Sequence, residues 1–338
     1  MTASAQQPTP TLFFETITAY QRAEAIKAAI EVDVFTAIGE GNQTASKIAV
    51  RCDASERGVR ILCDYLTMIG FLTKDGNSYG LTQDSAVFLD RRSPAYMGGA
   101  AEFLISDHIM EGFKHLAEAV RKGGNATPDE GALAPEHPVW VKFARAMAPM
   151  MRPVAETIAQ LIDPEANRKI KVLDIAASHG AFGLAFASRN PQAEIVGLDW
   201  ANVLELSKEN AKAAGVADRH RTIAGSAFEV DYGAGYDVVL LTNFLHHFDP
   251  PTIEKLLRKV HAALAEGGRA VTLEFVPNED RVSPPGVAGF SLVMLAGTPS
   301  GDAYTFAELD RMFRNAGFGK SELHEIPPAI QQLIVSHK

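Results

Sequence analysis

The fold is decided by the stretch Val172-Leu-Asp-Ile-Ala-Ala-Ser-His-Gly-Ala-Phe-Gly183, which Ile195-Val-Gly-Leu-Asp199 follows. The first run predicts a buried strand, a loop of small residues and the start of a helix, and the second predicts another strand that ends in an acid. A loop without bulky side chains lets a ligand approach the backbone at the crevice of a doubly wound sheet. The acid at the end of the next strand can bind both hydroxyls of a ribose. The pattern therefore predicts a site for a cofactor that contains a nucleoside.

The composition is that of an ordinary globular protein. The chain has 338 residues, of which 46% are hydrophobic and 22% charged, enough for two domains and a sizeable core. A formal net charge of -9 argues against nucleic acid as the main partner. Cys52 and Cys63 have no metal-ligand spacing and cannot form a disulfide framework, so we expect no metal site and a cytoplasmic location.

The first residues of the chain predict no targeting segment. Residues 1–11 are rich in Thr, Ser, Gln and Pro, which predicts a disordered tail rather than a signal peptide. No apolar run is long enough to span a bilayer, so we expect no membrane partner.

Residues 12–95 are predicted to form helices with a small hairpin. The helical spacing of apolar residues from Phe13 to Ile30 predicts a first helix. Two shorter helices over Thr44–Val50 and Arg57–Ile69 precede a hairpin over Phe71–Leu81. Helix, turn, helix and hairpin in this order are typical of a winged helix.

Residues 96–165 are predicted to be mainly helical, with a loop over Gly123–Pro138 and interruptions at Pro149, Pro153 and Pro164. Residues 166–338 alternate between strands and helices, which predicts an α/β fold with a parallel sheet covered on both faces. The predicted strands are Lys171–Ala176, Glu194–Leu198, Arg219–Ala224, Tyr236–Thr242, Arg269–Phe275 and Gln331–Ser336. The helices between them include Val203–Ala214 and Thr252–Leu264.

The loop is not a dinucleotide fingerprint. That fingerprint needs glycine at three positions, which Ala176, Ser178 and Ala181 occupy here. A phosphate loop ending in Lys-Ser or Lys-Thr is also missing.

Asp174, Ala176, Ser178 and Gly180 together resemble the first motif of S-adenosylmethionine-dependent methyltransferases, acid-x-Gly-x-Gly-x-Gly. Asp199 corresponds to the acid of the second motif. Gly225-Ser226-Ala227-Phe228 resembles the third motif, with Ser226 in place of its acid. Asn243-Phe-Leu-His-His-Phe248 resembles the catalytic motif Asn-x-Leu-His-Asp-Trp, with His246 at the catalytic base and His247 in place of the acid.

With the winged helix in front, nearly the whole chain resembles class I O-methyltransferases of the caffeate and hydroxyindole type. This resemblance implies a Rossmann-like seven-stranded sheet, a homodimer formed through the N-terminal domain, and S-adenosylmethionine as cofactor. It also implies a small-molecule acceptor, an aromatic or polyketide-like hydroxyl. The cofactor would contact Asp174, Ala176, Ser178, Gly180, Asp199, Trp200, Gly225, Ser226, Ala227, Phe228 and Asn243.

The resemblance also implies the catalytic residues. A histidine after a strand can take the proton of a phenol or enol, because its pKa lies near the operating pH. His246 is the expected base, and Glu274, at the end of the next strand, is expected to orient its ring. The acceptor pocket would include Phe143, Met147, His247, Phe290 and Met294, and would lie beside the helices of residues 96–165. Tyr20 and Phe14 are candidates for reaching the partner subunit's pocket.

Two alternatives remain open. The departures at Ser226, His247 and Ala303 allow non-methylating chemistry with a bound cofactor, and Asp302 could replace the acid missing at Ala303 only if its loop shifts. Arg57 and Arg60 on the second short helix allow a winged-helix transcriptional regulator, although most of that helix is needed for packing. Oxygen, nitrogen and carbon all stay open as the methylated atom.

Overall fold

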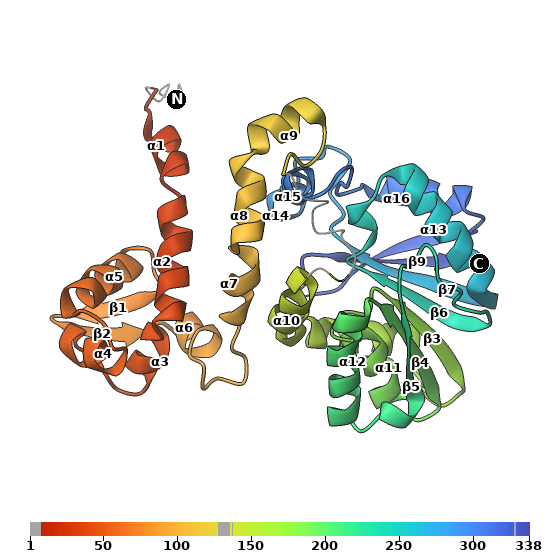
Figure 1. Ribbon diagram of the computed structural model, residues 1–338, viewed down its shortest axis with the longest axis horizontal. Helices are drawn as coiled ribbons and strands as arrows, with labels where there is room; N and C mark the ends of the chain where they lie inside the picture. Colours follow the sequence, from red (N-terminus) through yellow and green to blue (C-terminus); the bar gives the residue numbers. More distant parts are fainter. Residues whose placement is uncertain (1–7, 128–135, 137, 328) are drawn as a thin grey trace, which may run out of the picture. The chain divides into compact units, whose positions relative to one another are not determined.

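The computed structural model describes residues 8–127, 136, 138–327 and 329–338. These form two compact units, divided between Ile105 and Ser106 (Figure 1). Residues 1–7 of the predicted tail, and most of the predicted loop over Gly123–Pro138, lie outside the described residues. No helix in the described part of the chain is both long and apolar enough to cross a membrane.

The first unit contains the predicted helix pair and hairpin. Its elements are α1 (Thr11–Ile17), α2 (Tyr20–Glu31), α3 (Val34–Gly39), α4 (Ala45–Arg51), α5 (Glu56–Met68), β1 (Leu72–Asp75), β2 (Ser78–Leu81), α6 (Gln83–Phe88) and α7 (Gly99–Leu104). The side chains of Thr44 and Ser55 cap α4 and α5 by accepting backbone N–H bonds. The apolar spacing predicted a single first helix, but the structure has two helices, α1 and α2, which are separated at Thr18 and Ala19.

The second unit begins with α8 (Asp107–Lys114), α9 (Leu116–Lys122) and the long helix α10 (Pro138–Ile162). The predicted interruptions at Pro149 and Pro153 are wrong, because both prolines lie inside α10. Each proline costs a helix about 3 kcal/mol. The α10 side chains buried in the core, among them Val154, Ile158 and Ile162, each contribute about 1.5–3 kcal/mol, which offsets that cost.

The rest of this unit is a seven-stranded sheet with the order β5-β4-β3-β6-β7-β9-β8. Its strands are β3 (Ile170–Ile175), β4 (Ala193–Asp199), β5 (His220–Ala224), β6 (Tyr236–Thr242), β7 (Leu264–Glu274), β8 (Ser321–Glu325) and β9 (Gln332–His337). All neighbours run parallel except β9, which is antiparallel to both β7 and β8. The predicted sheet is confirmed.

Alternate residues of the central strands enter two separate cores. Leu173 and Leu241 face one core with α13 (Pro250–Ala263) and α16 (Phe306–Asn315), while Val172 and Leu240 face the other with α10, α11 (Ala181–Arg189) and α12 (Ala201–Ala213). Figure 1 shows these helices covering the two faces. Two short helices, α14 (Pro285–Ala288) and α15 (Phe290–Gly297), follow β7.

The strand order reverses at β3. The chain runs outward from β3 to β4 and β5, and then returns to the other side of β3 with β6. Ligands of such sheets bind at the carboxyl ends of the strands beside this reversal. The loops after β3, β4, β5 and β6, which carry the predicted motifs, therefore meet at one edge.

Candidate active site

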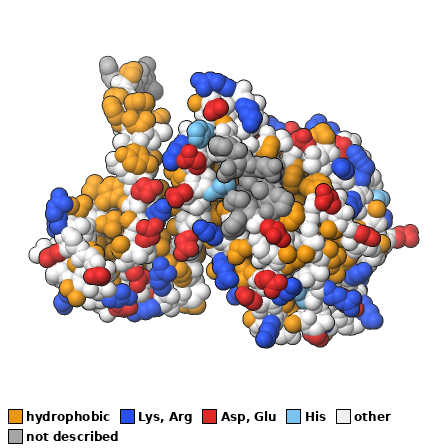
Figure 2. Space-filling view, in the orientation of Figure 1, with side chains coloured by type: hydrophobic (Ala, Val, Ile, Leu, Met, Phe, Trp, Pro, Cys, Tyr) orange, Lys and Arg blue, Asp and Glu red, His pale blue; other side chains and the backbone are white. Residues whose placement is uncertain are grey.

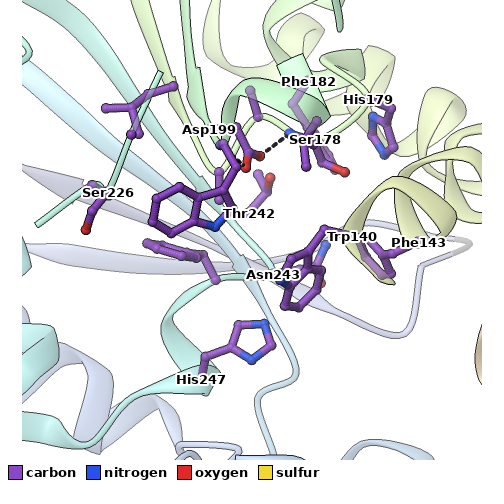
Figure 3. A pocket seen from close by; sticks show the side chains of 18 of the residues that line it. Trp140, Phe143, Ser178, His179, Phe182, Asp199, Ser226, Thr242, Asn243 and His247 are labelled. Carbon is purple, nitrogen blue, oxygen red and sulfur yellow. Dashed lines mark hydrogen bonds between the residues drawn. The ribbon is translucent and has the colours of Figure 1, made fainter. Parts of the chain in front are cut away.

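A cavity of about 400 Å³ lies at this edge, a size common for small-molecule sites (Figure 3). Its wall comes from α10, from the loops after β3 to β6, and from the first turns of α11 and α12. The residues that line it are Trp140, Phe143, Met151, Ala176, Ala177, Ser178, His179, Phe182, Leu198, Asp199, Trp200, Val203, Gly225, Ser226, Ala227, Phe228, Glu229, Thr242, Asn243, Phe244, His247 and Phe248.

The loop after β3 turns through three left-handed residues. Ala176, Ser178 and Gly180 have φ angles of 56°, 53° and 75°. These are the positions where the resembling motif has glycine, the residue that adopts this conformation without strain. Gly180 has a second constraint, because a Cβ there would lie 2.4 Å from Ser207 Oγ. The loop thus keeps the backbone of a glycine-rich turn although two of its glycines are replaced.

Asp199 connects this loop to β4. Its Oδ2 accepts a hydrogen bond from Ser178 N at 2.8 Å, and its Oδ1 accepts one from Trp200 N at 2.7 Å. Burial raises the pKa of Asp199 to about 6. No described cation pairs with this carboxylate, which lines the cavity (Figure 3). Each of its oxygens therefore keeps a free lone pair for a ligand hydroxyl.

Asp174 lies behind the loop and does not line this cavity. It belongs to β3 and is buried, and its Oδ2 accepts a hydrogen bond from Gly183 N at 2.9 Å while Oδ1 has no partner among the described residues. Burial raises the pKa of Asp174 to about 7. Its position ties the start of α11 to the sheet.

The turn after β5 also depends on glycine. Gly225 has a φ angle of 136°, and a Cβ there would lie 2.6 Å from Val230 Cγ1. Ser226, which stands where the motif has an acid, accepts a hydrogen bond from Phe228 N through its Oγ. Its hydroxyl therefore closes the turn.

Glu274 and His246 form a buried pair. His246 Nδ1 lies 2.5 Å from Glu274 Oε2, and Glu274 Oε1 accepts hydrogen bonds from the backbone N–H groups of Phe244 and Leu245. One carboxylate thus holds both the ring and the short turn η3 (Leu245–His247) that carries it. Because a carboxylate only accepts, Nδ1 is the donor in this contact, and the neutral form of the ring then has its lone pair on Nε2.

His247 faces the cavity directly. Its ring packs edge to face against Trp140 at 5.5 Å, and Trp140 packs likewise against Phe143 at 5.8 Å (Figure 3). Burial lowers the pKa of His247 well below its usual range, and the neighbouring His246 lowers it further. Its Nδ1 is buried without a hydrogen-bond partner among the described residues.

His246 stands beside this wall without forming part of it. Its ring is 4.4 Å from that of His247 and packs edge to face on Phe290 at 4.9 Å. Phe290 in turn stacks on Phe275 at 3.8 Å. The His246 ring therefore contacts both His247 and Phe290.

The remaining predicted residues divide into two groups. Ala176, Ser178, Trp200, the Gly225–Phe228 turn, Asn243 and Phe143 line the cavity, as do Asp199 and His247. Gly180, Glu274, Met147, Phe290 and Met294 are not among the residues that line it. Met147 packs on the core beneath α10, and Met294 is buried in α15.

Several lining residues were missed from the sequence. Trp140 comes from α10, and Phe182 and Val203 have the apolar spacing of ordinary core residues. His179 lies within the quoted loop, where its Nδ1 accepts a hydrogen bond from Ala181 N. Burial lowers the pKa of His179 to about 4, so the ring is neutral.

Asp302 does not replace the missing acid. Its carboxylate accepts hydrogen bonds from Ala303 N and from Arg281, while its own N–H donates to His246 O at 3.0 Å. Ala303 is fully buried. Among the described residues, Glu274 is thus the only carboxylate that contacts the His246 ring.

Two family models match the chain in order. The O-methyltransferase dimerisation domain matches residues 14–91, and the O-methyltransferase domain matches residues 113–319. A 3-hydroxy-5-methyl-1-naphthoate 3-O-methyltransferase from Streptomyces sahachiroi is 28% identical, over 91% of this chain and 89% of the relative. The tetracenomycin polyketide synthesis 8-O-methyltransferase from Streptomyces glaucescens is 27% identical, over 89% and 88%.

Solved structures of methyltransferases are also similar to this chain. A candidate O-methyltransferase from Nostoc punctiforme is 58% identical with a TM-score of 0.95, covering 98% of this chain and all of its own. Human N-acetylserotonin methyltransferase in complex with S-adenosylmethionine is 21% identical with a TM-score of 0.85, covering 100% of this chain and 99% of its own, and so shares the fold. The protein belongs to the S-adenosylmethionine-dependent O-methyltransferase family.

Proposed function

We propose that this enzyme methylates a hydroxyl of a small aromatic or polyketide-like molecule, with His246 as the general base. The observation that carries this proposal is the buried His246–Glu274 pair beside an aromatic-walled cavity. The two Streptomyces relatives named above, which act on a hydroxynaphthoate and in tetracenomycin polyketide synthesis, support the acceptor class.

The residues of the cavity fit the cofactor. The carboxylate of Asp199 has free lone pairs for the two ribose hydroxyls. Ser178 Oγ is buried without a partner among the described residues, as expected of a loop that a polar ligand completes. Trp200 and the Gly225–Phe228 turn would enclose the base. When bound, S-adenosylmethionine supplies an electrophilic methyl group on its sulfonium.

The acceptor end is walled by Trp140, Phe143, Phe244 and Phe248, which suits a planar aromatic ring. Holding such a ring in near-attack geometry can supply much of the rate of an in-line transfer. His246 would take the hydroxyl proton on Nε2, and Glu274 would stabilise the positive charge that this leaves on the ring. His247 is a weak base, because burial lowers its pKa well below the usual range of a histidine and its ring therefore binds a proton poorly.

The test is methyl transfer from labelled S-adenosylmethionine to 1-naphthol, 2-naphthol and 3-hydroxy-1-naphthoate. We expect label in a product of at least one of them. His246→Ala should lose at least about 100-fold in turnover and keep its affinity for S-adenosylhomocysteine. His324→Ala, on the half-exposed strand β8, is the control. Full activity of His246→Ala would remove His246 from the base role, and an unlabelled product would favour non-methylating chemistry.

We also propose a homodimer formed through the first unit. The dimerisation-domain match supports it, as does α1, which has no buried residue. Apolar side chains gather on α1 (Figure 2), and the exposed ones on it and at the start of α2 are Leu12, Phe13, Phe14, Ile17 and Tyr20. Phe14 and Tyr20 remain candidates for reaching a partner's pocket.

A further inference from the structure

A lysine is fixed behind the cavity wall. Lys259 lies on α13, and its Nζ donates hydrogen bonds to Ala227 O at 3.1 Å and to Val230 O at 2.5 Å. These two carbonyls flank Phe228 and Glu229, which line the cavity. The same ammonium lies 4.2 Å from the centroid of the Tyr232 ring, within cation–π range.

Two tyrosines complete this network. Tyr232 Oη donates to Ala227 O at 2.6 Å, so that carbonyl accepts two hydrogen bonds. Tyr236 Oη donates to Tyr232 O at 2.6 Å and thereby fixes the segment that follows the turn. Both tyrosines are buried. The carbonyls of the turn are therefore held on the side of α13, whereas its lining residues face the cavity.

The packing of α13 does not require a lysine at position 259. Ile253, Leu256, Leu257 and Val260 already bury the apolar face of α13. Burial lowers the pKa of Lys259, so placing an ammonium here has a cost, which the two carbonyls and the nearby carboxylates of Asp231 and Glu229 offset in part. Both hydrogen bonds that this ammonium donates end on the turn that lines the cavity.

We propose that Lys259 is a positioning residue, which fixes the part of the cavity that binds the adenine of the cofactor. By fixing the carbonyls of Ala227 and Val230, it holds the turn over residues 225–230 in the shape that receives the base. Ser226 Oγ accepts the N–H of Phe228 and offers no carboxylate to the adenine, so the shape of the turn's backbone carries more of the recognition. The inference rests on the assignment of this turn to the nucleoside, made under the proposed function.

The experiment measures binding by calorimetry, without an acceptor. The ligands are S-adenosylhomocysteine and S-inosylhomocysteine, which differ only in the base. The wild type should bind the adenine ligand at least about tenfold more tightly, since a shaped hydrogen-bonding site rejects an analogue that leaves its polar groups unpaired. Lys259→Met should weaken the adenine ligand about tenfold and the inosine ligand less than about twofold. Lys259→Arg, which keeps the donors, should restore most of the difference.

Lys255→Met is the matched control, because Lys255 is exposed on the same helix and its charge lowers the pKa of Lys259, so that its removal should not weaken the binding of either ligand. Tyr232→Phe removes the other donor to Ala227 O and keeps the test available if Lys259→Met does not fold. Equal weakening of both ligands would mean that Lys259 only stabilises the fold, and this would overturn the proposal. So would a wild type that does not distinguish the two bases. Neither result would bear on the proposed methyl acceptor or on His246 as the general base.

Discussion

At the scale of single residues, the loop after β3 holds two side chains in a conformation that disfavours them. Ala176 and Ser178 are left-handed, with φ angles of 56° and 53°. For a residue with a Cβ this conformation costs about 1–2 kcal/mol. The loop keeps its shape because Asp199 accepts the N–H of Ser178 and Ala177 donates to Leu198 O.

Ala176→Gly should therefore stabilise the protein. Relief of the left-handed cost exceeds the roughly 0.5–1 kcal/mol that glycine adds through unfolded-chain entropy, so we expect a gain of about 0.5 kcal/mol. Urea denaturation measures it. The control is Ala177→Gly, next in the chain and buried with a negative φ, which should destabilise the protein. A loss of stability in Ala176→Gly would show that the loop bears no strain at this residue.

Asp199 should make cofactor binding depend on pH. Its pKa is raised to about 6, and ribose hydroxyls need the ionised form, which accepts on both oxygens. Affinity should therefore be highest at pH 7 and above, and should be lost as the pH falls through 6. Because one pKa unit corresponds to a tenfold change, binding of S-adenosylhomocysteine should be about tenfold weaker at pH 5 than at pH 7.

Two variants show whether Asp199 or Asp174 causes the pH dependence of binding. Asp199→Asn should bind weakly at every pH, with a flat profile. Asp174→Asn should keep the wild-type slope, because Asp174 does not line the cavity although its pKa is also raised, to about 7. If the pH dependence of binding disappeared in Asp174→Asn instead, Asp174 and not Asp199 would be the titrating carboxyl.

At the scale of elements, the turn η3, which carries the proposed base His246, is held by one carboxylate at the end of β7. Glu274 accepts the N–H groups of Phe244 and Leu245 and contacts His246 Nδ1. The same side chain thus fixes where the turn lies and which ring nitrogen keeps its lone pair.

Glu274→Gln should separate these two roles. The glutamine oxygen can still accept both backbone N–H groups, but its NH₂ would meet Nδ1, which must then accept and leave the proton on Nε2. We expect turnover to fall at least about 100-fold with little change in melting temperature. Glu325→Gln, exposed at the end of β8, is the control. A large loss of stability with retained activity would contradict this division.

The same elements show what the sequence could predict. Buried strands such as β3 and β6 have continuous apolar runs. Residues at or soon after the carboxyl ends of such strands, Asp199 and His246 among them, lie at one edge because parallel strands end there. The strand β8 was not located, because its residues are mostly polar and only partly buried or exposed. Trp140 was missed because its place on the wall depends on how α10 packs, which is a tertiary property.

At the scale of the whole molecule, α1 presents an apolar surface that its own unit does not cover. Phe13 and Ile17 are 62% and 51% exposed, and nothing on this helix is buried. Isolated helices of this length are marginal in water, so α1 needs a partner to be stable. A second copy of the chain, joined through the dimerisation domain, would supply one.

We therefore expect a dimer of twice the chain mass of 36.4 kDa in light scattering coupled to size exclusion. Phe13→Asp combined with Ile17→Asp should give a monomer, because two carboxylates cannot be buried unpaired in an apolar interface. Val50→Asp, on the 85% exposed side chain at the end of α4, should leave the dimer intact. A monomeric wild type would refute the dimer, and dissociation by Val50→Asp alone would place the interface on α4. If Phe14 and Tyr20 do reach a partner's pocket, the monomeric variant should also show a higher KM for its acceptor while its affinity for S-adenosylhomocysteine is unchanged.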